Sequence, residues 1–236
     1  MVSDPIFRGG DNRTVGEPTR IKICGLTREA DVDAAVQAGA HYLGFVLYPP
    51  SPRHVALWRA AELAARLPRE VTPVLLFVNA SPQDVQTALA TVPRALVQFH
   101  GDETPEQCHT AAQGHAHWRA ARMQPGFDLL NFVVQHQQAQ AILLDAHVEG
   151  FGGAGRSFNW SLIPAGVPAR LVLSGGLNPA NVTDGIHRVR PWAVDVSSGV
   201  EACTGCKASK GIKDAGLMSE FCAAVRRADE ALAHGA

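Results

Sequence analysis

The sequence predicts an α/β fold in which eight strand–helix units close into one (β/α)8 TIM barrel. From Arg20 onward, short apolar runs alternate with helical patterns, as in a parallel sheet with crossover helices. Eight such units fill roughly 215 residues, at the compact end of the range for this barrel. An open doubly wound sheet is the alternative, but it usually has fewer strands, and no G-x-G-x-x-G motif follows the first strand.

Eight apolar runs are the predicted strands. They cover Ile21–Cys24, Tyr42–Leu47, Thr72–Val78, Ala95–Phe99, His117–Ala121, Ala141–Asp145, Arg170–Leu173 and Trp192–Val196. Helical patterns occupy the intervals, among them Arg28–Ala38, Ala56–Leu67 and a last one over about Gly216–Leu232. Two of the helices begin at a proline in the first turn, Pro82 and Pro105.

Composition and charge narrow the class of protein. The 236 residues are 46% hydrophobic and 18% charged, which is ordinary for a globular protein with a sizeable core. The formal net charge of −1 supplies no global field for nucleic acid or an anionic membrane. No apolar run approaches the roughly 20 residues of a membrane-spanning helix. We therefore expect no nucleic-acid partner and no membrane partner.

The N-terminus and the cysteines bear on domain boundaries and location. Residues 1–19 scatter glycine and proline among polar residues and lack a signal peptide's apolar centre, so we predict a flexible extension before a barrel domain over 20–236. Five cysteines without a small-domain spacing argue against a disulfide framework. A cytoplasmic location is expected.

The first strand ends in a thiol. In a period-2 strand Lys22 and Cys24 share one face, and Gly25 then breaks the run before a helix. Enzymes built from βα units place their chemistry at this point of the strand. The alternative is that Cys24 is a small buried apolar residue.

Several other strands carry polar residues, although strands covered on both faces should be apolar. With Lys22 and Cys24, the set is Gln98, His100, Arg119, Asp145 and Asp195. Closure places the first strand beside the eighth, so we expect Lys22 and Asp195 to pair inside the barrel, where an unpaired charge would be costly. A structural ion-pair network at the barrel centre is the alternative for Lys22, Gln98, Arg119 and Asp195. Cys24 and Asp145 precede flexible loops and are expected to face the mouth.

Two glycine turns predict a phosphate site. Ser174-Gly175-Gly176 follows the seventh strand and Ser197-Ser198-Gly199 follows the eighth. Barrels commonly hold a substrate phosphate at these two places, through backbone N–H groups. The predicted phosphate-binding residues are Gly175, Gly176, Ser197, Ser198 and Gly199, and the expected partner is a small phosphorylated molecule.

Seven runs together resemble the phosphoribosylanthranilate isomerase family. They are KICGLT (Lys22–Thr27), GFVLYPPSPR (Gly44–Arg53), VQFHGDE (Val97–Glu103), LLDA (Leu143–Ala146), GGAGRSFNW (Gly152–Trp160), LSGGLNPANV (Leu173–Val182) and DVSSGVE (Asp195–Glu201). The resemblance implies one step of tryptophan biosynthesis. That step is the Amadori rearrangement of N-(5-phosphoribosyl)anthranilate to 1-(2-carboxyphenylamino)-1-deoxyribulose 5-phosphate.

The resemblance also implies roles for matching residues. Cys24 would be the general base at the sugar C2 proton, and Asp145 the general acid at the ring oxygen. Arg53 would hold the anthranilate carboxylate through its planar fork. The following helix N-terminus is expected to favour the Cys24 thiolate, and partial burial to favour the acid form of Asp145. No metal and no redox cofactor is required, and the protein would be a monomer or homodimer.

The sequence departs from the family in two places. The predicted active-site loop, with Gly152, Gly153, Gly155 and Arg156, has alanine, arginine and asparagine at 154, 156 and 159, where threonine, lysine and aspartate are usual. We expect altered loop closure rather than lost activity. An insertion over about 202–209 contains Cys203 and Cys206, which lack the second ligand pair of a zinc site, so we predict an exposed loop with incidental thiols.

Two alternative functions are compatible with this barrel, and one group of histidines needs an interpretation. The related barrel isomerase of histidine biosynthesis would be expected to use an aspartate where this chain has Cys24. A catalytically dead barrel that only binds a sugar phosphate is the rival of another class. His109, His115 and His117 are interpreted as surface or packing residues.

Overall fold

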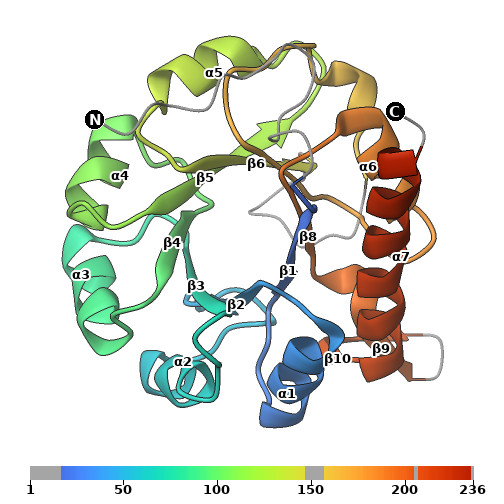
Figure 1. Cartoon of the computed structure of the whole chain (residues 1–236). Coiled ribbons are helices and arrows are strands. Elements are labelled where there is room, and N and C mark those ends of the chain that lie inside the picture. The colour runs from blue at the N-terminus through green and yellow to red at the C-terminus, as the bar shows by residue number, and fades with distance from the viewer. Residues whose placement is uncertain (1–16, 147–156, 205–206, 235–236) are drawn as a thin grey trace.

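The computed structural model describes residues 17–146, 157–204 and 207–234. Within these ranges eight parallel strands close into a barrel, each strand beside its predecessor and β8 beside β1, and helices surround the ring (Figure 1). The predicted (β/α)8 barrel is confirmed. Its strands are β1 (Arg20–Cys24), β2 (Tyr42–Val46), β3 (Thr72–Phe77), β4 (Leu96–Phe99), β5 (His117–Met123), β6 (Ala141–Ala146), β7 (Leu171–Leu173) and β8 (Ala193–Val196).

The outer layer consists of helices that cover the apolar outer faces of the strands. They are α1 (Glu29–Ala38), α2 (Leu57–Ala64), α3 (Pro82–Thr91), α4 (Pro105–Ala112), α5 (Leu129–Gln135), α6 (Val182–Val189) and α7 (Ala215–His234), with short 3-10 turns η1 (Trp160–Leu162) and η2 (Ser198–Val200). Both predicted proline starts are observed, each with a side-chain cap on the preceding residue, Ser81 and Thr104. The long α7 packs against α1 and α6 (Figure 1).

Aromatic side chains fill the amino-terminal end of the barrel. Tyr42 and Trp118 meet edge to face with ring centroids 4.9 Å apart, and Trp118 and Trp192 do so at 5.8 Å. All three lie at or near the first residues of their strands. Such pairs add to the free energy gained by burying the rings. Aromatic rings therefore occupy this end of the barrel, and the buried Lys22–Asp195 pair lies above them, toward the carboxyl ends of the strands.

The predicted pairing of Lys22 with Asp195 is confirmed. The two residues are register partners where β1 meets β8, and Lys22 Nζ lies 2.9 Å from Asp195 Oδ1. Burial alone would lower the pKa of Lys22, but the charge and hydrogen bond of the Asp195 carboxylate outweigh this effect. The net pKa of Lys22 therefore lies above its ordinary value. The ammonium therefore stays charged inside the barrel.

The prediction that Arg119 belongs to a network at the barrel centre is wrong. Its neighbours Trp118 and Ala120 belong to the interior cluster, so Arg119 points outward to the helix layer. There its guanidinium donates to the carbonyl oxygens of Gly101 and Glu103, both at 3.1 Å. The sequence does not reveal this because the phase of β5 depends on its register against β4 and β6. Arg119 supports the loop after β4 instead of the barrel centre.

The predicted loop at 202–209 is also wrong. The segment forms an antiparallel hairpin of β9 (Glu201–Thr204) and β10 (Lys207–Lys213). Its return strand is held by the first strand–helix turn, because Thr27 Oγ1 donates to the Gly211 carbonyl at 2.6 Å. Cys203 is an exposed free thiol, and Cys206 lies outside the described residues.

The described part of the chain begins at residue 17, shortly before β1. Thr19, which the sequence places in the extension, is buried and donates through N and Oγ1 to the Asp229 carboxylate, both at 2.7 Å. The rest of that extension, up to residue 16, lies outside the described residues.

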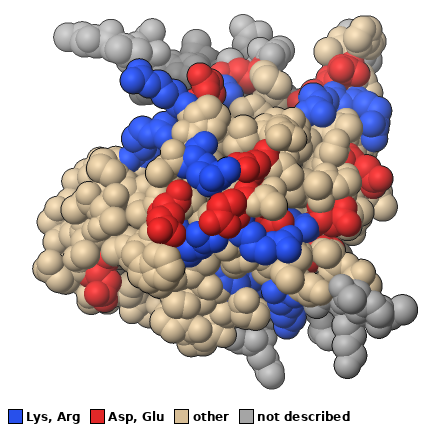
Figure 2. All heavy atoms as spheres, turned by 90° about the horizontal axis from the view of Figure 1, so that it is seen from below, with Lys and Arg blue, Asp and Glu red and all other residues tan. Residues whose placement is uncertain are grey.

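Basic and acidic side chains alternate over the face seen from below (Figure 2). Ion pairs such as Arg66–Asp33, at 2.6 Å, join α1 to the residues just after α2.

Replacing Lys22 by methionine should destabilise the protein strongly, because it leaves the Asp195 carboxylate buried without its partner. We expect the free energy of unfolding in urea to fall by about 3–5 kcal/mol. The matched control is Arg66→Met, which breaks an exposed, solvent-screened pair and should change the free energy of unfolding far less. Equal losses in the two variants would contradict the role assigned to the buried pair.

Candidate active site

The predicted base and acid both lie at the carboxyl-terminal mouth of the barrel. Cys24 is the last residue of β1, and Asp145 is the next-to-last residue of β6. Their strand neighbours two residues earlier, Lys22 and Leu143, belong to the interior, so both side chains point inward. Cys24 is 5% exposed and Asp145 9% exposed. The structure therefore places both at the same rim, with β7 and β8 between their strands.

The sulfur of Cys24 lies in a small apolar cluster at this rim. Val46, Leu76 and Val78 form the cluster with it, and Tyr48 packs against them. The neighbouring strand makes room for the sulfur through Gly44, where a Cβ would lie 2.6 Å from Sγ. Cys24 thus has an apolar wall on the β2–β3 side of the mouth.

The expected stabilisation of the Cys24 thiolate by a helix N-terminus is wrong. Burial raises the pKa of the Cys24 thiol, and the charge of Lys22 only partly opposes this. The helix α1 begins at Glu29 rather than directly after Cys24, and its first turn carries Glu29 and Asp31.

A hydrogen-bonded chain inside the barrel ends on Asp145. Gln98 Nε2 lies 3.0 Å from His100 Nδ1, and His100 Nε2 lies 3.1 Å from Asp145 Oδ2. All three side chains are buried, and Gln98 Oε1 is without a partner among the described atoms. The sequence shows Gln98 and His100 on one face of a strand, but only the folded barrel shows that this face meets Asp145.

The two predicted phosphate turns lie against each other. The turn after β8 approaches the loop after β7 so closely that a Cβ on Gly199 would lie 1.9 Å from the Leu177 carbonyl oxygen. Gly175 has φ of +77°, and its Cβ would lie 2.8 Å from the backbone nitrogen of Ala146, beside Asp145. On the other side Ser197 Oγ donates to the Cys24 carbonyl at 3.0 Å. The glycine turns therefore fill the rim between Asp145 and Cys24.

Arg53 does not stand open at the mouth. Its Nε and one terminal nitrogen donate to the two Glu201 oxygens at 2.6 and 2.8 Å, and it is 5% exposed. Burial alone would raise the pKa of Glu201, but the hydrogen bond from Arg53 and the charge of Lys213 bring it below its ordinary value. Binding of a substrate carboxylate by Arg53 stays a prediction.

Glu201 and Lys213 are buried charged residues to which the sequence gives no role. Both follow β8 and lie beyond any barrel strand. The rule that seeks polar residues at strand ends does not reach them. The predicted loop residues Gly152, Gly153, Gly155 and Arg156 lie outside the described part of the chain.

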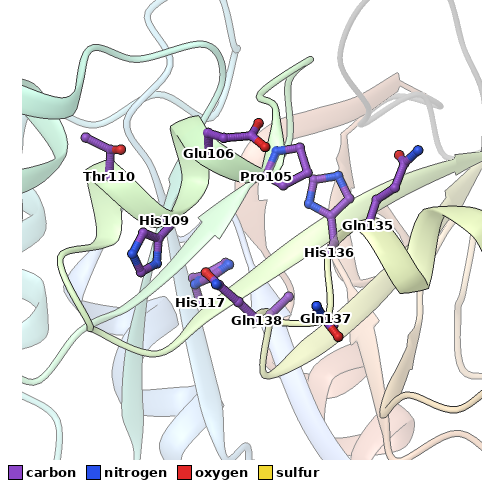
Figure 3. Close-up of a pocket in the computed structure, with 10 residues that line it drawn as sticks. Pro105, Glu106, His109, Thr110, His117, Gln135, His136, Gln137 and Gln138 are labelled. Atoms are coloured by element: carbon purple, nitrogen blue, oxygen red, sulfur yellow. The ribbon is translucent and has the colours of Figure 1, made fainter.

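A second cavity lies on the outer wall of the barrel. It has a volume of about 380 Å³ and is lined by residues of α4, of β5 and of the segment after α5 (Figure 3). Burial lowers the pKa of His117, and it lowers that of His136 to about 4. Because His117 is the first residue of β5, the cavity is remote from the strand ends that carry Cys24 and Asp145. His109 lines it from an exposed position and His117 from a buried one, in keeping with their interpretation as surface or packing residues.

Two negative findings apply to the described residues only. No group of three or more histidine, cysteine, aspartate or glutamate side chains there has the arrangement to hold a metal ion. No helix in the same ranges is long and apolar enough to cross a membrane.

The barrel and its mouth define the class of protein: a (β/α)8 barrel with candidate acid and base groups on either side of two glycine turns. The family model described as "N-(5'phosphoribosyl)anthranilate (PRA) isomerase" matches residues 21–224. The chain belongs to this family. Relatives of that name include one from Leptothrix cholodnii, 67% identical over 211 residues, covering 89% of this chain and 92% of the relative. Another, from Methylibium petroleiphilum, is 62% identical over 215 residues, covering 91% and 97%.

Solved structures of the family share the fold. Phosphoribosyl anthranilate isomerase from Thermotoga maritima is 38% identical with a TM-score of 0.77, covering 89% of this chain and 99% of that one. A second structure, at 36% identity and a TM-score of 0.74 with the same coverage, is of the isomerase in complex with reduced 1-(o-carboxyphenylamino)-1-deoxyribulose 5-phosphate.

The environment of Cys24 predicts how its alkylation depends on pH. Since burial raises the pKa of the thiol above its ordinary value of 9.0, the rate of iodoacetamide modification should rise with a midpoint above that value. Mass spectrometry of the Cys24 peptide measures this rate, and the denatured protein, in which the thiol has its ordinary pKa, is the control. A folded-state midpoint at or below that of the denatured chain would contradict the assignment.

Proposed function

We propose that this chain isomerises N-(5′-phosphoribosyl)anthranilate to 1-(2-carboxyphenylamino)-1-deoxyribulose 5-phosphate, with Cys24 as general base and Asp145 as general acid. The observation that carries the proposal is the order of groups around the rim. Asp145 on β6 and Cys24 on β1 flank the glycine turns that follow β7 and β8. A sugar held by its phosphate at those turns would lie between an acid and a base.

The reaction moves only protons and electron pairs within the substrate. A proton from Asp145 adds to the ring oxygen as the bond from that oxygen to C1 breaks, and the nitrogen lone pair forms the Schiff base. Cys24 then takes the proton from C2, which gives an enolamine, and this becomes the ketone as C1 gains a proton and the C2 hydroxyl loses one. No electron acceptor enters this sequence, so we propose a cofactor-independent isomerase.

His100 would position the Asp145 side chain, and two arrangements of protons are compatible with their contact. If Gln98 donates to Nδ1, then Nε2–H of His100 donates to an ionised Asp145. If the Gln98 amide is turned, its oxygen accepts from Nδ1–H, and Nε2 accepts from a protonated Asp145. Turning the amide gives Gln98 Oε1 a partner but leaves Nε2 without one among the described atoms, so both arrangements keep one amide atom unpaired.

Two further features of the mouth support the proposed identity of the substrate. The apolar wall of Val46, Leu76 and Val78 beside Cys24 suits the aromatic ring of anthranilate. Arg53 lies in a buried pair and would bind the ring carboxylate while Glu201 keeps its guanidinium in place.

Cys24→Ala and Asp145→Asn should each lower the turnover number by about a hundredfold or more, since each removes a group that moves a proton. The measurement is the loss of substrate fluorescence after adding purified protein. Cys203→Ala, which removes an exposed thiol, is the matched control and should be unchanged. Wild-type protein that binds the substrate without converting it would favour the dead barrel, and full turnover by Cys24→Ala would remove Cys24 from the mechanism.

His100→Asn should lower kcat by about tenfold or more with little change in KM, because the acid loses its positioning partner while the substrate contacts remain. His109→Asn, on the outer cavity, is the control and should match wild type. A variant at His100 with normal kcat would show that the contact to Asp145 is structural only.

A further inference from the structure

We propose that Lys213 is a positioning residue of this active site, whose buried ammonium fixes the phosphate turn after β8 and the Arg53–Glu201 pair relative to each other. The inference rests on the proposed function and adds to it a residue on the β9–β10 hairpin, outside the barrel strands. It joins the two places where the charged ends of the substrate would bind.

The contacts of Lys213 Nζ reach both places. It donates to the Ser197 carbonyl oxygen at 2.9 Å and lies 3.3 Å from Ser197 Oγ. It also lies 3.2 Å from Glu201 Oε1, the oxygen that accepts from Arg53 Nε. The Lys213 side chain is fully buried. An ammonium has three N–H donors, and three acceptors surround this one. Lys213 therefore acts through Ser197 and Glu201 and does not need to touch the substrate.

The base of the Lys213 side chain is itself held. Its backbone nitrogen donates to Asp31 Oδ2 at 3.1 Å, and Arg28 donates to its carbonyl at 3.3 Å. Asp31 and Arg28 also pair with each other at the start of α1. The backbone of Lys213 is thus fixed against the start of α1 by Asp31 and Arg28. From this fixed backbone the side chain extends to Ser197.

The charge of the cluster suits an anionic substrate. Arg53, Glu201 and Lys213 are all buried, and together they carry one net positive charge when ionised. Burial lowers the pKa of Lys213, but Glu201 opposes this effect. A buried positive charge beneath the Ser197 turn strengthens the attraction of backbone N–H groups for phosphate. The cluster would contribute to binding both phosphate and carboxylate.

The test compares Lys213→Met with Lys210→Met, which makes the same change at an exposed position of the same strand. Calorimetry with inorganic phosphate measures binding without turnover, and steady-state kinetics measure KM and kcat. For Lys213→Met we expect phosphate affinity to fall and KM to rise by about tenfold or more, with a smaller change in kcat. Lys210→Met should match wild type in all three.

Lys213→Gln guards against a folding failure, because it keeps N–H donors for Ser197 and Glu201 while removing the charge. It should also raise KM and weaken phosphate binding. Unchanged phosphate affinity and KM in a folded Lys213 variant would overturn the inference while leaving the proposed function intact. A wild-type protein that binds phosphate but does not isomerise the substrate would overturn the proposed function, and the phosphate titrations would still decide the role of Lys213.

Discussion

The buried pair between Lys22 and Asp195 is the interaction on which the arrangement of the mouth depends. It lies where β1 and β8 close the barrel, and it is satisfied only in the register that places these two residues side by side. A slip of one residue would turn Lys22 toward the apolar helix layer, at a large cost in desolvation. With this register fixed, Cys24 and Ser197 each lie two residues further along. The hydrogen bond from Ser197 Oγ to the Cys24 carbonyl follows from that placement.

The two ends of the barrel interior differ in the side chains that fill them. The aromatic cluster of Tyr42, Trp118 and Trp192 closes the amino-terminal end without polar groups that need a ligand. Toward the opposite end, buried polar residues contact one another: Lys22 with Asp195, and His100 with Asp145. Because these side chains are buried, their charges interact through protein rather than through solvent, and each contact is correspondingly stronger.

The sequence predicts the barrel, the strand ends and the pairing of Lys22 with Asp195, because all three follow from periodicity and closure. It does not predict that Arg119 faces outward, since that depends on how β5 is registered against its neighbours. It misses the β9–β10 hairpin because tertiary contacts at Thr27 and Asp31 hold the segment in place. The contact of His100 with Asp145 is likewise invisible, since it joins residues 45 positions apart across the barrel. What escapes prediction is the set of contacts between strands, rather than the strands themselves.

In the proposed mechanism, the environment of Cys24 affects both the strength of the thiolate as a base and the fraction of molecules that carry it. Burial and Asp195 raise the pKa of the thiol, whereas Lys22 and Lys213 lower it. A thiolate formed against an apolar wall is a stronger base than one in water, because it gives up solvation that would otherwise stabilise it. It is also rarer at neutral pH, so proton transfer from carbon gains driving force while fewer molecules are ready to react. The two lysines limit that loss. One of them, Lys22, lies within the barrel, and the other, Lys213, lies on the hairpin.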